Sequence, residues 1–144
     1  VFHRRIEEGR IIENLFRKHG ISFRSLRGEI KNKTQQYEEF RKDSKIRGLI
    51  AHPKCGGEGI DIPEASVMIF YSYPNSLIDW EQCVGRVLRP DQKKKCVIIN
   101  LVLEGTIDEH IVKGINEHKD TEKTILRYIE RFIHQTKKNR KRNF

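Results

Sequence analysis

Two arginines and a glutamine near the middle of the chain have the spacing of one helix face. Gln82, Arg86 and Arg89 fall together when successive residues advance by about 100°. Two neighbouring guanidinium groups repel each other unless an anion lies between them. Phosphate is the anion whose oxygens match the planar guanidinium fork. The pattern therefore predicts a phosphate-facing surface, and the alternative interpretation is an ordinary solvated basic face.

The helix that must carry this face is predicted over residues 76–90. Ser76, followed three residues later by Asp79, has the spacing of a capping box, and Pro90 ends the helix. Gly85 leaves room beside the polar face for the close approach of a ligand or a second backbone. The opposite face is an apolar stripe that is expected to pack on the core and is formed by Trp80, Val84, Val87 and Leu88.

A glycine-rich loop at 53–63, PKCGGEGIDIP, precedes that helix. Gly57 and Gly59 leave backbone N–H groups open to approach, as a nucleotide-binding loop requires, and Asp61 is placed to accept a hydrogen bond from a ribose hydroxyl. The alternative is a plain turn in which Asp61 caps a helix. The sequence contains no GK[ST] run, so a triphosphate and its Mg²⁺ would have to be held elsewhere. An arginine pair without a phosphate cradle is typical of a surface that supplies an arginine finger to a second domain.

The order of the predicted elements indicates an α/β fold with an open, mainly parallel sheet flanked by helices. Apolar or alternating runs predict strands at 1–3, 21–26, 48–51, 67–71 and 96–103. Amphipathic spacing predicts helices at 6–19 (with Ile11, Ile12, Leu15 and Phe16 as its apolar positions and Gly20 behind it), 34–42 (with Tyr37 and Phe40), 76–90, and from Thr106 onward. The run at 67–71 is continuously apolar, as in a strand that is buried on both faces, and 96–103 is expected to be another buried strand. The chemistry-bearing loops are expected beyond the carboxyl ends of the strands.

Positive charge is concentrated at the end of the chain. The net charge is +9, and residues 119–144 hold nine Lys and Arg against three Asp and Glu. Apolar residues at 125–133 have helical spacing, and the terminal KKNRKRNF is expected to be disordered when unbound. We therefore divide the chain into a compact domain at 1–119 and a helical extension with a basic tail at 120–144. The tail would attract a polyanion such as nucleic acid, or would serve solubility alone.

Composition excludes several classes of protein. No apolar run approaches the roughly 18 residues of a membrane span, so no membrane partner is expected. Cys55, Cys83 and Cys96 are widely spaced, without CxxC or His pairing, so neither a metal site nor a disulfide scaffold is predicted. A reducing compartment fits best, either the cytoplasm or, in a eukaryote, the nucleus. The first residues have the pattern of a strand's end, and we expect the sequence to be a fragment that lacks upstream residues.

Several of these segments resemble the motifs of superfamily-two helicases, and among them most closely the Swi/Snf-like DNA translocases. GGEGIDIPEAS at 56–66 is similar to motif V, and QCVGRVLRP at 82–90 is similar to motif VI. The further counterparts follow the order that the family has and are SLRG at 25–28, QQYEEFRKD at 35–43 and EGTIDEHI at 104–111. The resemblance covers residues 1–119.

The resemblance implies the carboxy-terminal RecA-like lobe of a two-lobed, ATP-driven motor. ATP and Mg²⁺ would be held mainly by an N-terminal RecA-like lobe, so this chain alone would be inactive. Arg86 and Arg89 would reach the γ-phosphate, with Arg89 as the finger, and Gln82 would help to order the site. The residues along the nucleotide edge would be Gly57, Gly59 and Asp61. The expected partners are the N-terminal lobe and DNA, or alternatively RNA.

Three cations are the candidates for contacts with nucleic-acid phosphates. Arg27, Lys31 and Lys54 are predicted in loops on one side of the sheet, and phosphate contacts need only such cations. Lys54 stands where the family often has Ser or Thr ahead of motif V. The alternative for each of the three is ordinary surface charge. Few aromatic residues are positioned to stack on bases, which favours tracking of the backbone over base reading.

Two other functions fit part of the pattern. A non-catalytic nucleic-acid-binding module would act through the basic tail. An ordinary metabolic nucleotide-binding domain would bind a nucleotide unaided. The leading hypothesis is the second motor lobe of an ATP-dependent DNA helicase or translocase.

Overall fold

The computed structural model describes residues 1–55, 60–74, 76–88 and 95–117. The chain divides into two compact units, Val1–Pro74 with Ile78–Leu101, and Asn75–Leu77 with Val102–Phe144. The first unit contains the strands. The predicted boundary between residues 119 and 120 lies outside the described residues.

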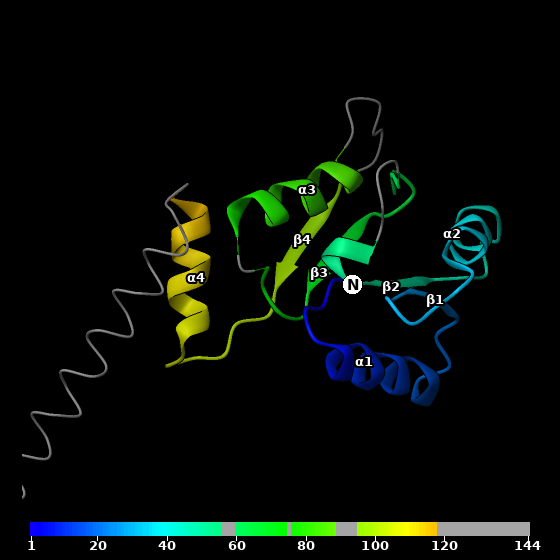
Figure 1. Cartoon of the computed structure of the whole chain (residues 1–144), viewed down its shortest axis with the longest axis horizontal. Helices are drawn as coiled ribbons and strands as arrows, with labels where there is room; N and C mark the ends of the chain where they lie inside the picture. Colours follow the sequence, from blue (N-terminus) through cyan, green and yellow to red (C-terminus); the bar gives the residue numbers. More distant parts are fainter. Residues whose placement is uncertain (56–59, 75, 89–94, 118–144) are drawn as a thin grey trace, which may run out of the picture. The chain divides into compact units, whose positions relative to one another are not determined.

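The first unit is built on parallel strands (Figure 1). β1 (Phe23–Leu26) pairs with β2 (Gly48–Ala51), and β3 (Val67–Phe70) pairs with β4 (Val97–Asn100), both in parallel. All four strands lie within or next to the predicted runs. The prediction of an α/β fold with a mainly parallel sheet is confirmed.

The strand predicted at residues 1–3 is reduced to a bridge at Phe2. Phe2 pairs in parallel with Ala51 on one side and with Phe70 on the other. Its N–H donates to the Ile69 carbonyl at 2.7 Å, and its carbonyl accepts from the Tyr71 N–H at 2.8 Å. Phe2 therefore joins the two strand pairs into one array in the order β1, β2, Phe2, β3, β4.

The helices fall where amphipathic spacing predicts them. They are α1 (Ile6–Lys18), α2 (Lys33–Lys42), α3 (Leu77–Val87) and α4 (Ile107–Asn116), with a short 3₁₀ helix η1 at Pro53–Cys55. In the second unit α4 begins at the predicted cap, because the Thr106 hydroxyl accepts from the Asp108 N–H at 3.2 Å. The helical extension predicted after residue 119 lies outside the described residues.

The start of α1 is fixed by the carboxylate of Glu8. Its Oε2 accepts from the backbone N–H groups of Arg4 at 2.9 Å and Arg5 at 3.0 Å, and from the Ser72 hydroxyl at 2.6 Å. The helix end also follows the sequence pattern, since Gly20 has a φ of +65°, the left-handed conformation that favours glycine after a helix. Glu8 therefore caps α1 and fastens it to the residues that follow β3.

We expect Glu8→Gln to destabilise the first unit by about 1 kcal/mol at neutral pH, the cost of losing a helix cap. Burial raises the pKa of Glu8, but the hydrogen bonds from Ser72, Arg5 and Arg4 outweigh it and hold the pKa below the usual 4.5. The stabilisation is therefore present above pH 4.5 and is lost as the pH falls through the lower pKa of the folded state. Urea unfolding should show the difference between wild type and variant shrinking in acid. The exposed neighbour Glu7→Gln is the control, and an equal loss there would contradict the cap.

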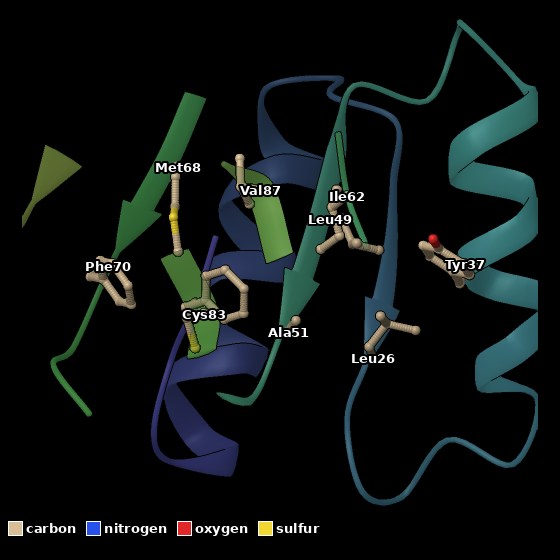
Figure 2. Packing of buried hydrophobic residues seen from close by; sticks show 10 residues of the cluster. Leu26, Tyr37, Leu49, Ala51, Ile62, Met68, Phe70, Cys83 and Val87 are labelled. Atoms are coloured by element: carbon tan, nitrogen blue, oxygen red, sulfur yellow. The ribbon is translucent and has the colours of Figure 1, made fainter. Parts of the chain in front are cut away.

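The core lies between the sheet and the helices that cover it (Figure 2). The Phe70 ring stacks on Phe2, Tyr73 and Trp80, with centroid distances of 5.6, 5.7 and 6.3 Å. All of β2 is buried, as a central strand should be.

The prediction that β3 and β4 are completely buried strands is wrong for part of each strand. Val67 of β3 and Val97 of β4 are 50% and 54% exposed, because side chains alternate along a strand and β4 is the edge of the described sheet. The buried face of α1 contains Gly9, Ile12 and Glu13, whereas Ile11 and Leu15 are 48% and 45% exposed. Helical spacing alone does not fix which side of an apolar stripe meets the core.

A cavity of about 550 Å³ opens at the amino ends of the central strands. It is lined by Gly48 at the start of β2, Val67 at the start of β3, and Val87 at the end of α3, among others. The amino end of the sheet and the end of α3 therefore lie close together.

Candidate nucleotide-facing site

The polar face predicted on α3 is oriented away from the core. Cys83 and Val87 are 1% and 2% exposed and contribute to the core, with Trp80 and Val84 packed against it. On the other side Gln82 is exposed and Arg86 is partly buried, one helical turn apart. That these two side chains face a phosphate stays a prediction, and Arg89 lies outside the described residues.

Two details of the apolar stripe differ from the prediction. Leu88 is 43% exposed, because the stripe is centred on Cys83, Trp80 and Val87 and Leu88 lies at its margin. Cys83 is a core residue that the sequence analysis did not place in the stripe. Burial raises the pKa of the Cys83 thiol to about 12, so this side chain is an unreactive apolar group.

The backbone of Arg86 is bonded directly to the segment that follows the glycine loop. The Ile62 N–H donates to the Arg86 carbonyl at 2.6 Å, and Ile62 is 5% exposed in the core. The end of the predicted motif V is thus joined to the helix of the predicted motif VI. Asp61, the neighbour of Ile62, is described and partly buried, whereas Gly57 and Gly59 lie outside the described residues.

The described residues show where the ends of the two predicted motifs lie. η1, which opens the glycine-rich segment 53–63, follows the carboxyl end of β2 as expected, whereas Val87 and Ile62 lie with Leu49 near the amino end of β2 (Figure 2). The reason is geometric: α3 leaves the carboxyl end of β3 and runs back along the sheet, and eleven residues at about 1.5 Å each carry its end to the opposite edge.

A second connection holds the segment after the glycine loop. The Tyr37 hydroxyl of α2 donates to the Asp61 carbonyl. One turn later Arg41 lies over the Tyr37 ring, 5.6 Å from its centroid, and its Nε is 2.8 Å from the Glu64 carboxylate. Burial raises the pKa of Tyr37, so the hydroxyl keeps its proton and remains a donor. Sequence reasoning treated Tyr37 only as an apolar position, because nothing local indicates a partner 24 residues away.

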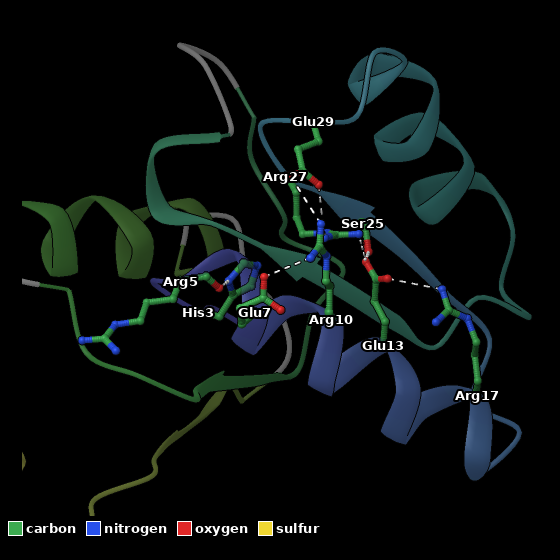
Figure 3. A network of polar contacts seen from close by, with 9 residues as sticks. All are labelled: His3, Arg5, Glu7, Arg10, Glu13, Arg17, Ser25, Arg27 and Glu29. Atoms are coloured by element: carbon green, nitrogen blue, oxygen red, sulfur yellow. Dashed lines mark hydrogen bonds and ion pairs between the residues drawn. The ribbon is translucent and has the colours of Figure 1, made fainter.

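Arg27, a predicted nucleic-acid ligand, is engaged inside the fold (Figure 3). Its side chain is 13% exposed, and its Nη2 lies 2.8 Å from the Glu13 carboxylate, which is 7% exposed. The same carboxylate accepts from the Ser25 hydroxyl at 2.6 Å and pairs with Arg17 at 3.2 Å. This geometry favours a structural role for Arg27, and its contact with a phosphate stays a prediction.

The other two cation candidates are open to solvent. Lys31 lies in the turn before α2, and Lys54 lies in η1, where its N–H donates to His52 Nδ1 at 3.1 Å. His3, which sequence reasoning passed over, is 1% exposed, and its Nδ1 is 2.8 Å from the Arg5 carbonyl. Burial lowers the pKa of His3, so the ring is neutral at pH 7.

Within the described ranges, no group of His, Cys, Asp or Glu side chains is arranged to hold a metal ion. In the same part of the chain, no helix is both long enough and apolar enough to cross a membrane.

Comparison with known proteins places this arrangement in a family. The profile described as the helicase conserved C-terminal domain matches residues 1–91. Helicase SWR1 of Mycosarcoma maydis is 28% identical over 127 residues, which cover 83% of this chain and 7% of that protein. The DNA repair and recombination protein RDH54 of Saccharomyces cerevisiae is 36% identical over 106 residues, which cover 72% of this chain and 11% of that protein.

A solved structure agrees with the fold. The C-terminal part of the Fun30 ATPase domain is similar with a TM-score of 0.70 at 25% identity, and the match covers 78% of this chain and 37% of that one. The present chain spans 7% of the SWR1 relative and 11% of the RDH54 relative. From its motifs, its sheet and these matches, the chain belongs to the helicase conserved C-terminal domain family, as a Swi/Snf-like, superfamily-two RecA-like lobe.

Proposed function

We propose that this chain is the second motor lobe of an ATP-dependent DNA helicase or translocase. Arg86 and Arg89 reach the γ-phosphate of an ATP that an N-terminal RecA-like lobe holds with Mg²⁺, and Gln82 orders the site. Gly57, Gly59 and Asp61 lie along the nucleotide edge. Nucleic-acid phosphates are contacted by exposed cations such as Lys31 and Lys54.

The observation that carries this proposal is the hydrogen bond between the Ile62 N–H and the Arg86 carbonyl. It fastens the segment after the glycine loop to the helix whose outer face presents Gln82 and Arg86. Both segments therefore meet one nucleotide from one edge of the sheet. A finger residue of this kind acts on a phosphate that another domain cradles, and the sequence has no phosphate cradle of its own.

The 144-residue chain alone is expected neither to hydrolyse ATP nor to bind it tightly. Joined to a nucleotide-binding lobe, it is expected to complete an ATPase that nucleic acid stimulates. Calorimetry with ATP and Mg²⁺ measures the first expectation, and phosphate release with and without duplex DNA measures the second. Tight nucleotide binding by the isolated chain would instead favour a self-sufficient nucleotide-binding domain. Stimulation that vanishes when residues 137–144 are deleted would assign the DNA contact to the basic tail.

A further inference from the structure

We propose that Tyr37 is a positioning residue for the arginine face of α3. Its hydroxyl holds the main chain at Asp61, which fixes Ile62 against Arg86 and so sets where the guanidinium of Arg86 points. The inference rests on the proposed function for the role of Arg86. The connection itself is a property of the fold.

The connection consists of two consecutive hydrogen bonds, one from a side chain to the main chain and one between main-chain groups. The Tyr37 hydroxyl donates to the carbonyl of Asp61, and the N–H of the next residue, Ile62, donates to the carbonyl of Arg86 at 2.6 Å. The carbonyl of residue 61 and the N–H of residue 62 belong to the same peptide group. Since a peptide group is planar and stiff, fixing its oxygen also fixes the direction of its N–H. Tyr37 therefore orients the bond that reaches Arg86.

α2 contacts the segment after the glycine loop through two interactions, and the hydrogen bond from the Tyr37 hydroxyl is the stronger of them. Tyr37 is 8% exposed and its hydrogen bond to the Asp61 carbonyl is partly buried, and removing one partner of such a bond leaves the other less well satisfied. The ion pair between Arg41 and Glu64 lies outside it, with side chains 41% and 36% exposed. Ion pairs this exposed contribute little to stability. Arg41 acts mainly by covering the Tyr37 ring.

The chain offers a matched control for removal of this hydroxyl. Tyr73 is 3% exposed in the same core, and among the described residues its hydroxyl is a buried group without a hydrogen-bond partner. Tyr37→Phe and Tyr73→Phe therefore delete the same atom from equally buried rings. Only the first deletion breaks the connection to residue 61.

The first test is amide hydrogen exchange on the complete 144-residue chain. We expect Tyr37→Phe to speed exchange at Ile62 by about five- to tenfold, the factor that one hydrogen bond is worth. Exchange at the core amides of Leu49 and Ile50 should stay unchanged. Tyr73→Phe should leave the exchange rates of all three amides unchanged. Unchanged exchange at Ile62 in Tyr37→Phe would overturn the proposal, as would an equal increase at all three amides, which would indicate global loosening.

The second test measures ATP turnover in the motor that joins this chain to its nucleotide-binding lobe. We expect Tyr37→Phe to lower kcat by about tenfold with KM for ATP unchanged, because a misplaced finger weakens the transition state and leaves ground-state binding intact. In an Arg86→Ala background the same substitution should lower kcat by less than about twofold, because the effects of two residues that act through one another are not additive. A full tenfold loss in that background would show that Tyr37 does not act through Arg86.

The two tests separate this inference from the function on which it rests. If the wild-type joined protein hydrolyses no ATP, or if Arg86→Ala is fully active, the proposed function fails whatever the exchange data show. If the wild type is active, Arg86 is required and Tyr37→Phe turns over normally, the positioning role fails and the motor assignment stands.

Discussion

Replacing Arg89 with alanine is expected to reduce ATP turnover of the joined motor by about 10³- to 10⁵-fold, the contribution of an arginine finger to phosphoryl transfer. Arg89 follows Arg86 by three positions on the predicted polar face and lies outside the described residues. Arg89→Lys should recover little of the loss, because an ammonium group keeps the charge but lacks the fork that engages two phosphate oxygens. The measurement is kcat at saturating ATP and nucleic acid.

The exposed Lys18 in the last turn of α1 supplies the control. Lys18→Ala removes one positive charge far along the sequence from the predicted face and should leave kcat within about twofold of wild type. Thermal melting of the 144-residue chain should be the same for wild type, Arg89→Ala and Lys18→Ala. Undiminished turnover by Arg89→Ala would remove this residue from the finger role, and Arg86→Ala would then test whether its neighbour alone supplies it.

The second large effect is expected at Glu13, where a charge is removed from inside the fold. Glu13→Gln leaves the guanidinium of Arg27, 13% exposed, without its carboxylate at 2.8 Å. Breaking a buried pair by removing one partner costs about 3–5 kcal/mol, because the remaining charge is poorly hydrated and keeps only the exposed Glu29 carboxylate, 3.8 Å away. Urea unfolding of the variant should therefore show a correspondingly lower free energy of unfolding, or no cooperative transition at all.

Two further variants show which interaction of Glu13 accounts for the lost stability. Glu29→Gln removes an exposed carboxylate, 3.8 Å from the same guanidinium, and should change the free energy of unfolding by less than about 1 kcal/mol. The double variant Glu13→Leu with Arg27→Met removes both charges and should regain most of the lost stability. A double variant as unstable as Glu13→Gln would mean that Glu13 acts through Ser25 and Arg17 and not through the pair with Arg27.

Local patterns were sufficient to predict the elements and their order. Amphipathic spacing placed α1, α2 and α3, the four buried residues of β2 matched their predicted bounds, and Gly20 ended α1 with a positive φ. These features depend on neighbours in the sequence. The family was predictable for the same reason, since each motif is a short run of residues.

The predictions that failed depend on tertiary partners. An apolar run such as 96–103 indicates a strand, but whether its second face is covered depends on what lies beside β4. Arg27 was interpreted as a surface cation because Glu13, 14 positions earlier, gives no signal of an internal pair in the sequence.

The connection between α2 and α3 runs through main-chain groups at positions 61, 62 and 86. The one side chain that takes part in its two hydrogen bonds is the phenol of Tyr37. These hydrogen bonds are made by main-chain groups at 61, 62 and 86, so they do not depend on which side chain stands at position 61, whereas position 62 must stay apolar because Ile62 is 5% exposed in the core. Proline at position 62 is the exception, because it has no N–H to donate. Substitutions at position 61 would thus test the Asp61 side chain itself while the two main-chain groups that make the connection stay in place.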